Sequence, residues 1–304
     1  MTGANWLQTT AERVKKGDID GLHDSAYQLY AGAWRRGGRI YNYGDPVYEK
    51  EWDLLIVLDA CRYDLFQEVV NNYDFLNDGM TNSIGSATEE WMGKNFTSKY
   101  YKKISQTVYI SGNPHSAEEG TRSFRHIEDV WSHSWDDEVR TTLAEDVTEY
   151  AIAAGRELNP ERTIVHYMQP HHPFVSSPEL NEGIGFDQGA EYKHIWEKLR
   201  RGEVSHEAVW EGYLENLRYV LDSVTTLLEN FDANNAVITS DHGNAMGEYG
   251  IYGHPMYIPL SVLKRVPFCR TTATDRRTLS PSVELTGKSV DEDVSERLGD
   301  LGYA

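Results

Sequence analysis

A short apolar run that passes directly into polar residues constrains the fold of this chain more than any other feature. Residues 236–240 (A-V-I-T-S) are apolar and β-branched, which predicts a short buried strand, and Asp241, His242 and Gly243 follow at once. A carboxylate and an imidazole side by side at the carboxyl end of a strand suit a divalent cation. A glycine-rich loop then leads to His254. The alternative is an ordinary strand and turn with surface histidines.

Two further apolar runs end in polar side chains. Residues 53–58 (D-L-L-I-V-L) predict a strand buried on both faces, as in a parallel sheet, and Asp59 follows it. Residues 163–174 predict another buried strand, which ends at His171 and His172. Open α/β sheets place their ligands at the carboxyl ends of strands, so these side chains are candidates for one site. Alternatively, Asp59 could cap a helix at residues 65–70, and the two histidines could belong to an ordinary loop.

Thr88 stands where a helix is predicted to begin, in the stretch T-E-E-W of residues 88–91. The simplest interpretation is that Thr88 or Ser86 is the N-cap of this helix. The same position would turn the hydroxyl towards free backbone N–H groups, where an oxyanion or phosphate would bind. A divalent metal in contact with the hydroxyl would lower its pKa and make it a nucleophile. The two interpretations are compatible.

The rest of the chain fits one large α/β domain, residues 51–304, preceded by a helical arm in residues 1–50. Residues 206–230 show the clearest amphipathic helix, because apolar side chains recur at every third and fourth position. A helix is also expected at residues 138–157 and another at 5–37, where Gly37 and Gly38 should stop it. Further expectations are a strand and turn at 107–114, an irregular segment at 115–137, a loop with a short helix at 175–205, a strand at 260–263, an irregular stretch at 270–290 and a short helix at the end of the sequence.

The charge of the chain is strongly negative, with 48 acidic against 29 basic residues and a formal net charge of −19. The acidic residues are dispersed, which argues against binding to nucleic acid or anionic lipid. Such acidity suits a protein kept soluble in concentrated salt, so a halophilic source is a hypothesis. Two cysteines, Cys61 and Cys269, do not make a disulfide framework. Without a visible secretory signal or membrane-spanning run, we expect a cytoplasmic protein.

These residues occur in an order that resembles the sulfatase branch of the alkaline phosphatase superfamily. The order is Asp59 after the first strand, Thr88 at a helix start, His171 in H-H-P-F, the helix Y-L-E-N-L-R-Y-V-L-D, and S-D-H-G-x-x-x-G-E-x-G followed by His254. The ending L-G-D-L-G-Y is also common in sulfatase-like chains. The resemblance implies a three-layer αβα sandwich around a mainly parallel sheet, with a metal at the strand ends.

The resemblance also implies roles for the residues of the predicted metal site. Asp59, Asp241 and His242 would bind the metal. Thr88 would be a further ligand and the nucleophile, and it would form a phospho-threonine intermediate.

A second group of residues would contact the substrate. His171 and His254 would hold its anionic group or a second metal, and one of them would protonate the leaving group. His172 is the close alternative to His171. Arg62 would hold the anion or would merely pair with Asp64, and we favour the pairing.

Departures from the family pattern narrow the expected chemistry. Thr88-Glu89-Glu90-Trp91 replaces the C-x-P-x-R pattern of formylglycine sulfatases, and Asp59-Ala60 replaces the Asp-Asp pair of many sulfatases. Zinc or manganese is therefore expected rather than calcium in an all-oxygen site. The ligand set resembles phosphoethanolamine and lipoteichoic-acid-type transferases more, although those usually have Glu at the position of Asp59 and are membrane-anchored.

The expected function is a metal-dependent hydrolase or transferase that acts on a phosphate or sulfate ester of a small molecule, glycan or lipid. Two alternatives remain on the same scaffold. One is a sulfuric ester hydrolase, and the other is a non-catalytic protein that binds a glycan or a partner.

Overall fold

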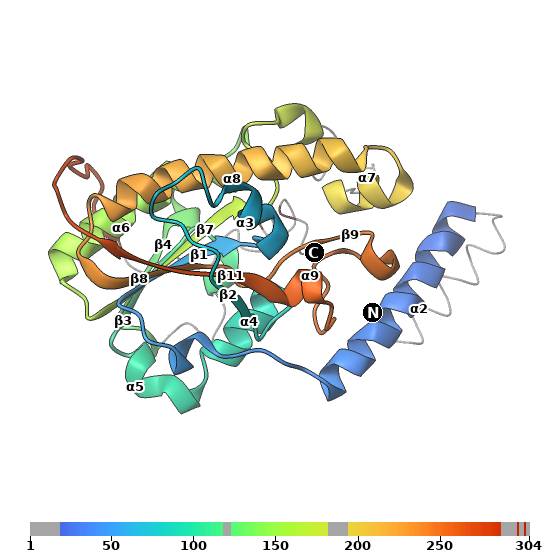
Figure 1. The fold of residues 1–304 in the computed structure, drawn as a ribbon, viewed down its shortest axis with the longest axis horizontal. Helices are drawn as coiled ribbons and strands as arrows, with labels where there is room; N and C mark the ends of the chain where they lie inside the picture. Colours follow the sequence, from blue (N-terminus) through green and yellow to red (C-terminus); the bar gives the residue numbers. More distant parts are fainter. Residues whose placement is uncertain (1–18, 118–122, 182–193, 287–296, 298–300, 302–304) are drawn as a thin grey trace.

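A seven-stranded sheet runs through the centre of the computed structural model, which describes residues 19–117, 123–181, 194–286, 297 and 301 (Figure 1). The strand order is β2-β11-β8-β1-β7-β3-β4. The parallel strands are β8 (Ala233–Thr239), β1 (Leu54–Asp59), β7 (Arg162–Pro170), β3 (Thr107–Ser111) and β4 (His126–Asp129). Beyond β8, β11 (Arg265–Ala273) pairs antiparallel with β8, and the edge strand β2 (Met80–Asn82) pairs antiparallel with β11. The expected mainly parallel sheet is confirmed.

Strand β1 shows how the sequence produces two hydrophobic cores. All six of its residues are buried. Leu54, Ile56 and Leu58 belong to one core, whereas Leu55 and Val57 belong to the other. Successive side chains of a strand point to opposite faces, so a strand covered on both sides needs a continuous apolar run. The sheet therefore lies between two layers of helices, as the predicted three-layer αβα sandwich requires.

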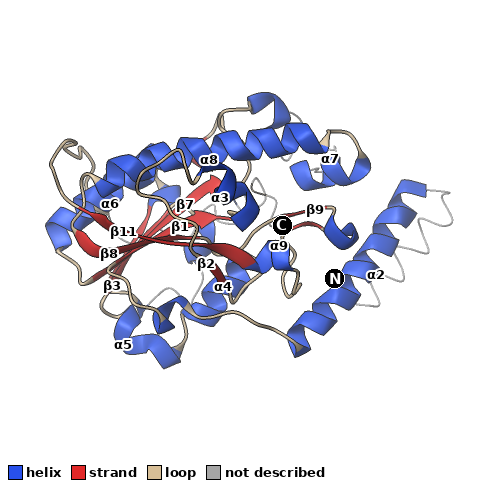
Figure 2. Cartoon of the chain, in the orientation of Figure 1, coloured by secondary structure: helices blue, strands red, loops and turns tan. Residues whose placement is uncertain are grey.

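Helices cover both faces of this sheet (Figure 2). On one face lie α3 (Tyr63–Val69), α6 (Ala144–Leu158) and α8 (His206–Leu228), and on the other α4 (Thr88–Asn95) and α5 (Tyr101–Ile104). Helix α8 buries the apolar stripe that predicted it, and its N-cap Ser205 accepts a hydrogen bond from the backbone N–H of Ala208 at 3.1 Å. The helices expected at residues 65–70 and 206–230 are confirmed within two residues of each end. The helix expected at 138–157 is also present, but it begins at Ala144, because residues 141–142 form the short strand β6 (Thr141–Thr142).

The N-terminal arm differs from its prediction at its C-terminal end. Helix α2 (Ile19–Ile40) continues through Gly37 and Gly38, so the expected stop at these glycines is wrong. A Cβ added at Gly38 would overlap the backbone carbonyl of Tyr257. This glycine therefore serves the close approach of two segments rather than a helix end. Residues 5–18 of the predicted helix lie outside the described residues, and the division at residue 50 stays a prediction.

Three other segments were not read correctly from the sequence. Residues 260–263 are not a strand, because α9 (Ser261–Lys264) forms a helical turn there and β11 follows it. Strand β11 includes residues 270–273, the start of the stretch 270–290 that was expected to be irregular. Exposed polar residues interrupt its buried positions, so its sequence lacks the continuous apolar run of the central strands. The segment 115–137, also expected to be irregular, contains the edge strand β4, whose acidic residues Glu128 and Asp129 are buried.

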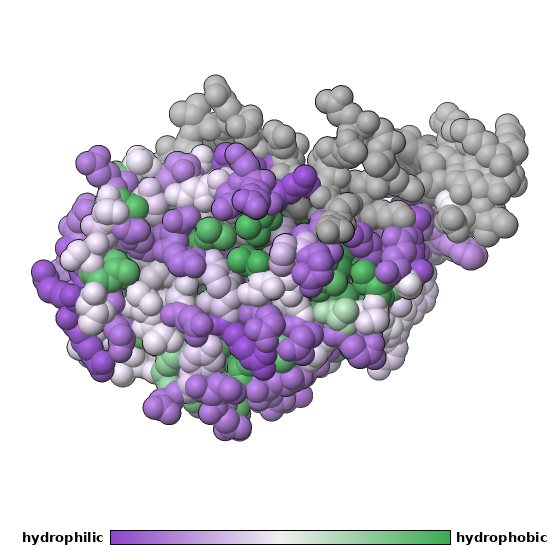
Figure 3. Space-filling view, turned by 90° about the horizontal axis from the view of Figure 1, so that it is seen from above, coloured by the Kyte–Doolittle hydropathy of each residue, from purple (hydrophilic) through white to green (hydrophobic). Residues whose placement is uncertain are grey.

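The remaining expectations concern connecting segments and the surface. Residues 175–205 hold a 3-10 turn, Pro178–Asn181, and the short helix α7 (Ile195–Arg201), as expected outside residues 182–193. The helix expected at the end of the sequence falls largely outside the described residues. Among the described helices, none has the length and apolar character needed to cross a bilayer. Hydrophilic residues dominate the described part of the face in Figure 3.

Candidate metal and ester-transfer site

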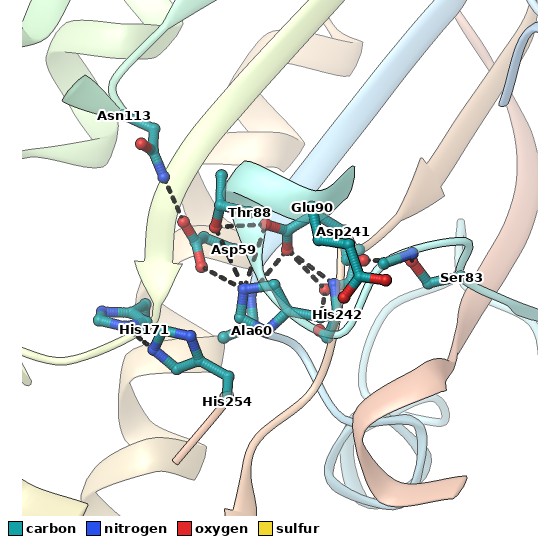
Figure 4. A network of polar contacts seen from close by, with 12 residues as sticks. Asp59, Ala60, Ser83, Thr88, Glu90, Asn113, His171, Asp241, His242 and His254 are labelled. Carbon is teal, nitrogen blue, oxygen red and sulfur yellow. Dashed lines mark hydrogen bonds and ion pairs between the residues drawn. The ribbon is translucent and has the colours of Figure 1, made fainter. Parts of the chain in front are cut away.

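The carboxyl ends of three adjacent strands bring together the polar residues identified in the sequence (Figure 4). Asp59 is the last residue of β1, Asp241 lies just beyond the end of β8, and His171 follows β7. Thr88 reaches the same place from the start of α4. All four side chains are buried. The convergence follows from the parallel arrangement, because the carboxyl ends of neighbouring strands lie at the same edge of the sheet.

The Thr88 hydroxyl lies between an acid and an imidazole. Its Oγ1 donates to Oδ2 of Asp241 at 2.8 Å and lies 3.1 Å from Nε2 of His242. Ala87 is the N-cap of α4, and no side chain caps this helix. The simple interpretation of Thr88 or Ser86 as a side-chain cap is therefore wrong. The hydroxyl is directed into the site instead of back towards its own helix.

Asp59 does not cap the helix after it either. Its Oδ2 accepts a hydrogen bond from the side-chain amide of Asn113 at 2.6 Å, and its Oδ1 lies 3.8 Å from Nε2 of His242. The next residue, Ala60, has a positive φ of 60°. This conformation directs its backbone N–H to Oδ1 of Asp241, at 3.0 Å. A left-handed alanine costs on the order of 1 kcal/mol, so this turn holds a strained conformation that joins the two carboxylates.

The orientation of the His242 ring fixes which nitrogen faces the site. Its Nδ1 lies 3.0 Å from the carbonyl oxygen of Gly243. A carbonyl can only accept, so Nδ1 carries the proton, and in the neutral ring Nε2 presents its lone pair to Thr88 and the carboxylates. Metal-binding histidines are commonly oriented by such a bond from the second nitrogen.

His166 is a member of the site that the sequence analysis missed. It lies within β7, and its Nε2 is 3.9 Å from Oδ2 of Asp59 and 3.9 Å from Oδ2 of Asp241. This buried nitrogen has no hydrogen-bond partner among the described residues. Its Nδ1 lies 2.9 Å from the hydroxyl of Tyr109, on the neighbouring strand β3. The only signal in the sequence was a single polar residue inside an apolar run, which indicates burial but no function.

The buried charges influence one another strongly. Burial alone would raise the pKa of Asp241, but the imidazoles of His242 and His166 and the bonds from Ala60 and Thr88 hold it below its ordinary value. Burial lowers the pKa of His166 to about 4, so this ring is neutral near pH 7. Two carboxylates and neutral imidazoles in a buried place form an electrostatic environment that favours a cation.

A second group of imidazoles lies next to this pair of acids. Nε2 of His171 lies 3.0 Å from Nε2 of His254, and the ring of His254 stacks on that of His242 with centroids 4.6 Å apart. The ring of His172 stacks on that of His171, at 4.4 Å between centroids, and also contacts the rings of His194 and Trp196. The structure therefore brings His171 and His254 together at the site, with His172 next to His171.

These imidazoles are held in their neutral form. Burial lowers the pKa of His171 to about 3 and the pKa values of His172 and His254 well below their ordinary range. Nδ1 of His171 donates to the carbonyl of His172, which leaves the lone pair on its Nε2. The short Nε2–Nε2 contact then requires the Nε2 proton on His254, which donates it to His171.

Arg62 is directed away from these residues. Its guanidinium forms two bonds to Asp64, at 2.8 and 2.6 Å, and its Nη1 pairs with Glu248 at 2.8 Å and donates to the carbonyl of Asn244 at 2.9 Å. The pairing with Asp64, which was the favoured alternative, is confirmed. The structure gives no support to Arg62 as an anion-binding residue, because its donors are engaged elsewhere.

Glu90 ties the Thr88 segment to the His254 segment. The carboxylate oxygen Oε2 of Glu90 accepts from the backbone and hydroxyl of Ser86, at 3.0 and 2.8 Å, and from the backbone N–H of Tyr257 at 2.8 Å. Ser86 precedes Thr88 by two residues, and Tyr257 follows His254 by three. We refer to these contacts as the Glu90 bridge. It fixes the hydroxyl and the imidazole relative to each other.

The residues present fit a divalent cation. Asp59, His166 and Asp241 each offer a ligand atom, and these atoms lie within 4.8 Å of one another. The unpartnered Nε2 of His166 is the kind of buried polar atom that a bound cation would satisfy. The set combines carboxylate and imidazole donors, which zinc and manganese accept more readily than calcium does.

Several solved structures are similar to this chain. The chain is similar to the soluble domain of lipooligosaccharide phosphoethanolamine transferase A from Neisseria meningitidis, with 15% identity over 71% of this chain and 75% of that chain and a TM-score of 0.45. It is similar to the C-terminal periplasmic domain of EptC from Escherichia coli, in complex with Zn, with 12% identity over 77% and 76% and a TM-score of 0.48. A 2-O GAG sulfatase is 14% identical over 72% of this chain and 63% of that chain, with a TM-score of 0.42.

The sequence comparison places the chain in a family. No curated protein matches it significantly. The family model described as Sulfatase matches residues 67–268, which is more than half of the 304 residues. This matched range contains Thr88, His171, Asp241, His242 and His254. The chain belongs to the Sulfatase family, in the sulfatase-like branch of the alkaline phosphatase superfamily.

Proposed function

We propose that this protein is a metal-dependent hydrolase or transferase that attacks a phosphate ester with the hydroxyl of Thr88. The observation that carries the proposal is the contact of Thr88 Oγ1 with both Asp241 and His242, at 2.8 and 3.1 Å. An ordinary threonine hydroxyl is a weak nucleophile and needs a neighbouring base or a metal. Here its proton has two acceptors, the Asp241 carboxylate and the lone pair of His242.

The chain would hold the cation with Asp59, Asp241 and His242, with Thr88 and His166 beside them. A divalent cation bound there would lower the pKa of the Thr88 hydroxyl and offset negative charge on the oxygens of the ester. Zinc or manganese fits this donor set best. Asn113 supports the site by its bond to Asp59, because that bond fixes the direction of the carboxylate.

The reaction that fits these residues has two displacements. In the first, Thr88 Oγ1 bonds to phosphorus while the bond between phosphorus and the alcohol oxygen breaks. In the second, water or an acceptor hydroxyl displaces the threonine and releases the phosphoryl group. The N-terminus of α4, which begins at Thr88, would offer its backbone N–H groups to the charge that develops on the phosphoryl oxygens.

His254 and His171 would serve the leaving group. The tautomers place the exchangeable proton on Nε2 of His254, so this residue would donate to the departing oxygen while His171 orients it. A bound phosphate dianion would raise the pKa of these buried imidazoles and make the charged form available as a general acid.

The test is hydrolysis of an aryl phosphate by the purified protein, with and without zinc or manganese. We expect Thr88→Ala to lower kcat by roughly a thousandfold or more, since it removes the attacking atom. Thr97→Ala is the matched control, because Thr97 is half-buried and gives no side-chain cap to the turn it precedes. Acid-quenched wild type should carry a phosphoryl group on the peptide that contains Thr88.

Other outcomes would select the other candidates. Turnover of an aryl sulfate without turnover of the phosphate would indicate a sulfuric ester hydrolase. If Thr88→Ala keeps the full measured function, the catalytic proposal is wrong and a binding role for a glycan or partner is favoured.

A further inference from the structure

The large exposed hydrophobic side chains of this protein gather at one place. Seven such side chains occur among the described residues, and five lie on α2, just after it, or against it: Leu29, Tyr30, Ile40, Tyr41 and Tyr249. Tyr249 belongs to this set because the Tyr30 hydroxyl donates to its carbonyl at 2.7 Å. The exposed fractions are 52% for Leu29, 90% for Ile40 and 70% for Tyr41. Single exposed apolar residues are ordinary, but a concentration of them marks an interaction surface.

One face of helix α2 is packed against the protein, and the opposite face is exposed. One face packs on residues 249–259 through Tyr27, Ala31, Trp34 and Gly38, which recur at intervals of three and four. The other face carries the exposed residues Leu29, Ala33, Arg36 and Ile40, which recur at the same intervals. In Figure 1 this helix lies at the edge of the molecule, apart from the sheet.

The charge of α2 differs from that of the chain as a whole. Arg35, Arg36 and Arg39 are all exposed, in a chain whose formal net charge is −19. Exposed leucine and isoleucine side chains on the helix face that also carries Arg36, with Arg35 and the exposed Tyr41 close in the sequence, are typical of helices that lie in the interface of a bilayer. We propose that α2 docks this protein onto an anionic lipid surface.

Charge decides between a lipid surface and a second copy of the chain. A two-fold symmetric dimer through this face would bury the arginines of both copies in one interface. Asp24, the only acidic residue in residues 21–40, already pairs with Arg200 and Arg201, so this part of α2 offers these arginines no free acidic partner. Anionic headgroups are complementary to them instead. The dispersed acidic residues oppose binding, but their effect fades beyond about 8 Å at physiological salt, so the local arginines dominate at contact.

The inner face of α2 connects this surface to the site. The Tyr27 hydroxyl accepts from the backbone N–H of Tyr252 at 3.1 Å, and the Arg39 guanidinium lies 4.8 Å from the ring centroid of Tyr257. His254 lies between these two contacts in the sequence. A lipid surface that holds the outer face of α2 would therefore be separated from the segment that carries His254 by the width of one helix, about 10 Å. The docking itself does not depend on the chemistry proposed for Thr88.

The test is flotation of the full chain with vesicles of phosphatidylcholine alone or mixed with phosphatidylglycerol. We expect binding to the anionic vesicles and a loss of roughly tenfold or more in affinity for the double variant Leu29→Asp with Ile40→Asp. Arg35→Gln with Arg36→Gln should weaken binding by roughly fivefold for each arginine. The matched control is Met80→Asp with Tyr101→Asp, because these exposed apolar residues lie away from α2. Circular dichroism checks that each variant folds.

Three results would overturn the proposal. The first is no binding of wild type to anionic vesicles, and the second is equal losses in the α2 variant and in the control. The third is a dimer in size-exclusion chromatography that the α2 variant abolishes, because a second copy would then cover this face. Since vesicle binding needs no substrate, a failure here leaves the ester-transfer proposal intact, and an inactive enzyme leaves this one intact.

Discussion

Removing the hydroxyl of Tyr109 offers a sharp test of how the site holds a cation. This hydroxyl lies 2.9 Å from Nδ1 of His166, and both residues are fully buried. A cation on Nε2 requires the proton on Nδ1, where the oxygen of Tyr109 accepts it. Tyr109→Phe keeps the ring and removes the hydroxyl, which is the acceptor for His166 and also hydrogen-bonds the side chain of Ser111.

The expected magnitude follows from the burial of the pair. A buried donor left without a partner costs about 1–3 kcal/mol, and 1.4 kcal/mol corresponds to a tenfold change in an equilibrium constant. A cation on Nε2 of His166 keeps the proton on Nδ1, whereas the metal-free ring can carry its proton on either nitrogen. The cost of the missing acceptor therefore falls on the metal-bound state. We therefore expect Tyr109→Phe to bind zinc or manganese about 10- to 100-fold more weakly than wild type.

The assay is a competition titration of the metal against a chelator of known affinity, at fixed pH. Tyr167→Phe is the matched control, because Tyr167 is equally buried, follows His166 in β7 and contacts the Thr148 hydroxyl at 2.7 Å rather than the site. Both variants should lose about 1 kcal/mol in urea denaturation of the metal-free protein. Only Tyr109→Phe should lose metal affinity. Equal metal affinities of the two variants would refute the assignment of His166 to the cation site.

Three further outcomes follow from other contacts. Glu90→Ala, which removes the Glu90 bridge, should lower the free energy of unfolding by about 2–3 kcal/mol, because buried donors lose their acceptor. An unchanged midpoint in urea denaturation would contradict the role of the bridge. Gly243→Ala should be strongly destabilising, because the new Cβ would overlap the carbonyl of Val262. Gly93→Ala in α4 should stabilise the fold by about 0.5–1 kcal/mol, because its Cβ would meet nothing within 4 Å. Melting temperatures that shift alike in the two variants would refute this contrast. Burial lowers the pKa of Lys264 from 10.5 to about 8. Between about pH 8 and pH 10.5 the unfolded chain binds more protons than the folded chain. The free energy of unfolding should therefore rise with pH in wild type, relative to Lys264→Met, by on the order of 2 kcal/mol. Urea titrations that give parallel pH profiles for the two proteins would contradict this prediction.

The central strands could be predicted from the sequence, because a strand that is buried on both faces needs a mainly apolar run of residues. The runs that became β1, β7 and β8 are mainly apolar, and their shared direction placed Asp59, His171 and Asp241 at one edge. Thr88 was found through the helix that begins with it. These predictions needed only local patterns and one rule about parallel sheets.

The missed features depend on tertiary contacts that a local pattern does not contain. His166 lies inside an apolar run, and only the neighbouring strand shows that Tyr109 orients it and that both acids lie near it. Strand β11 was missed because buried and exposed residues are mixed along this antiparallel strand, and its exposed arginine and threonine residues are typical of irregular chain. Gly38 was interpreted as a stop because its close neighbour, Tyr257, is more than two hundred residues away.

The span of the site along the chain has a consequence for the order of synthesis. Asp59 and Thr88 belong to the first third of the chain, and Asp241, His242 and His254 belong to the last. A nascent chain that ends before residue 241 has the threonine and one acid but neither the second acid nor its adjoining imidazole. In the proposed site, capture of a cation would thus be a late event, and it would require β8 to lie already beside β1.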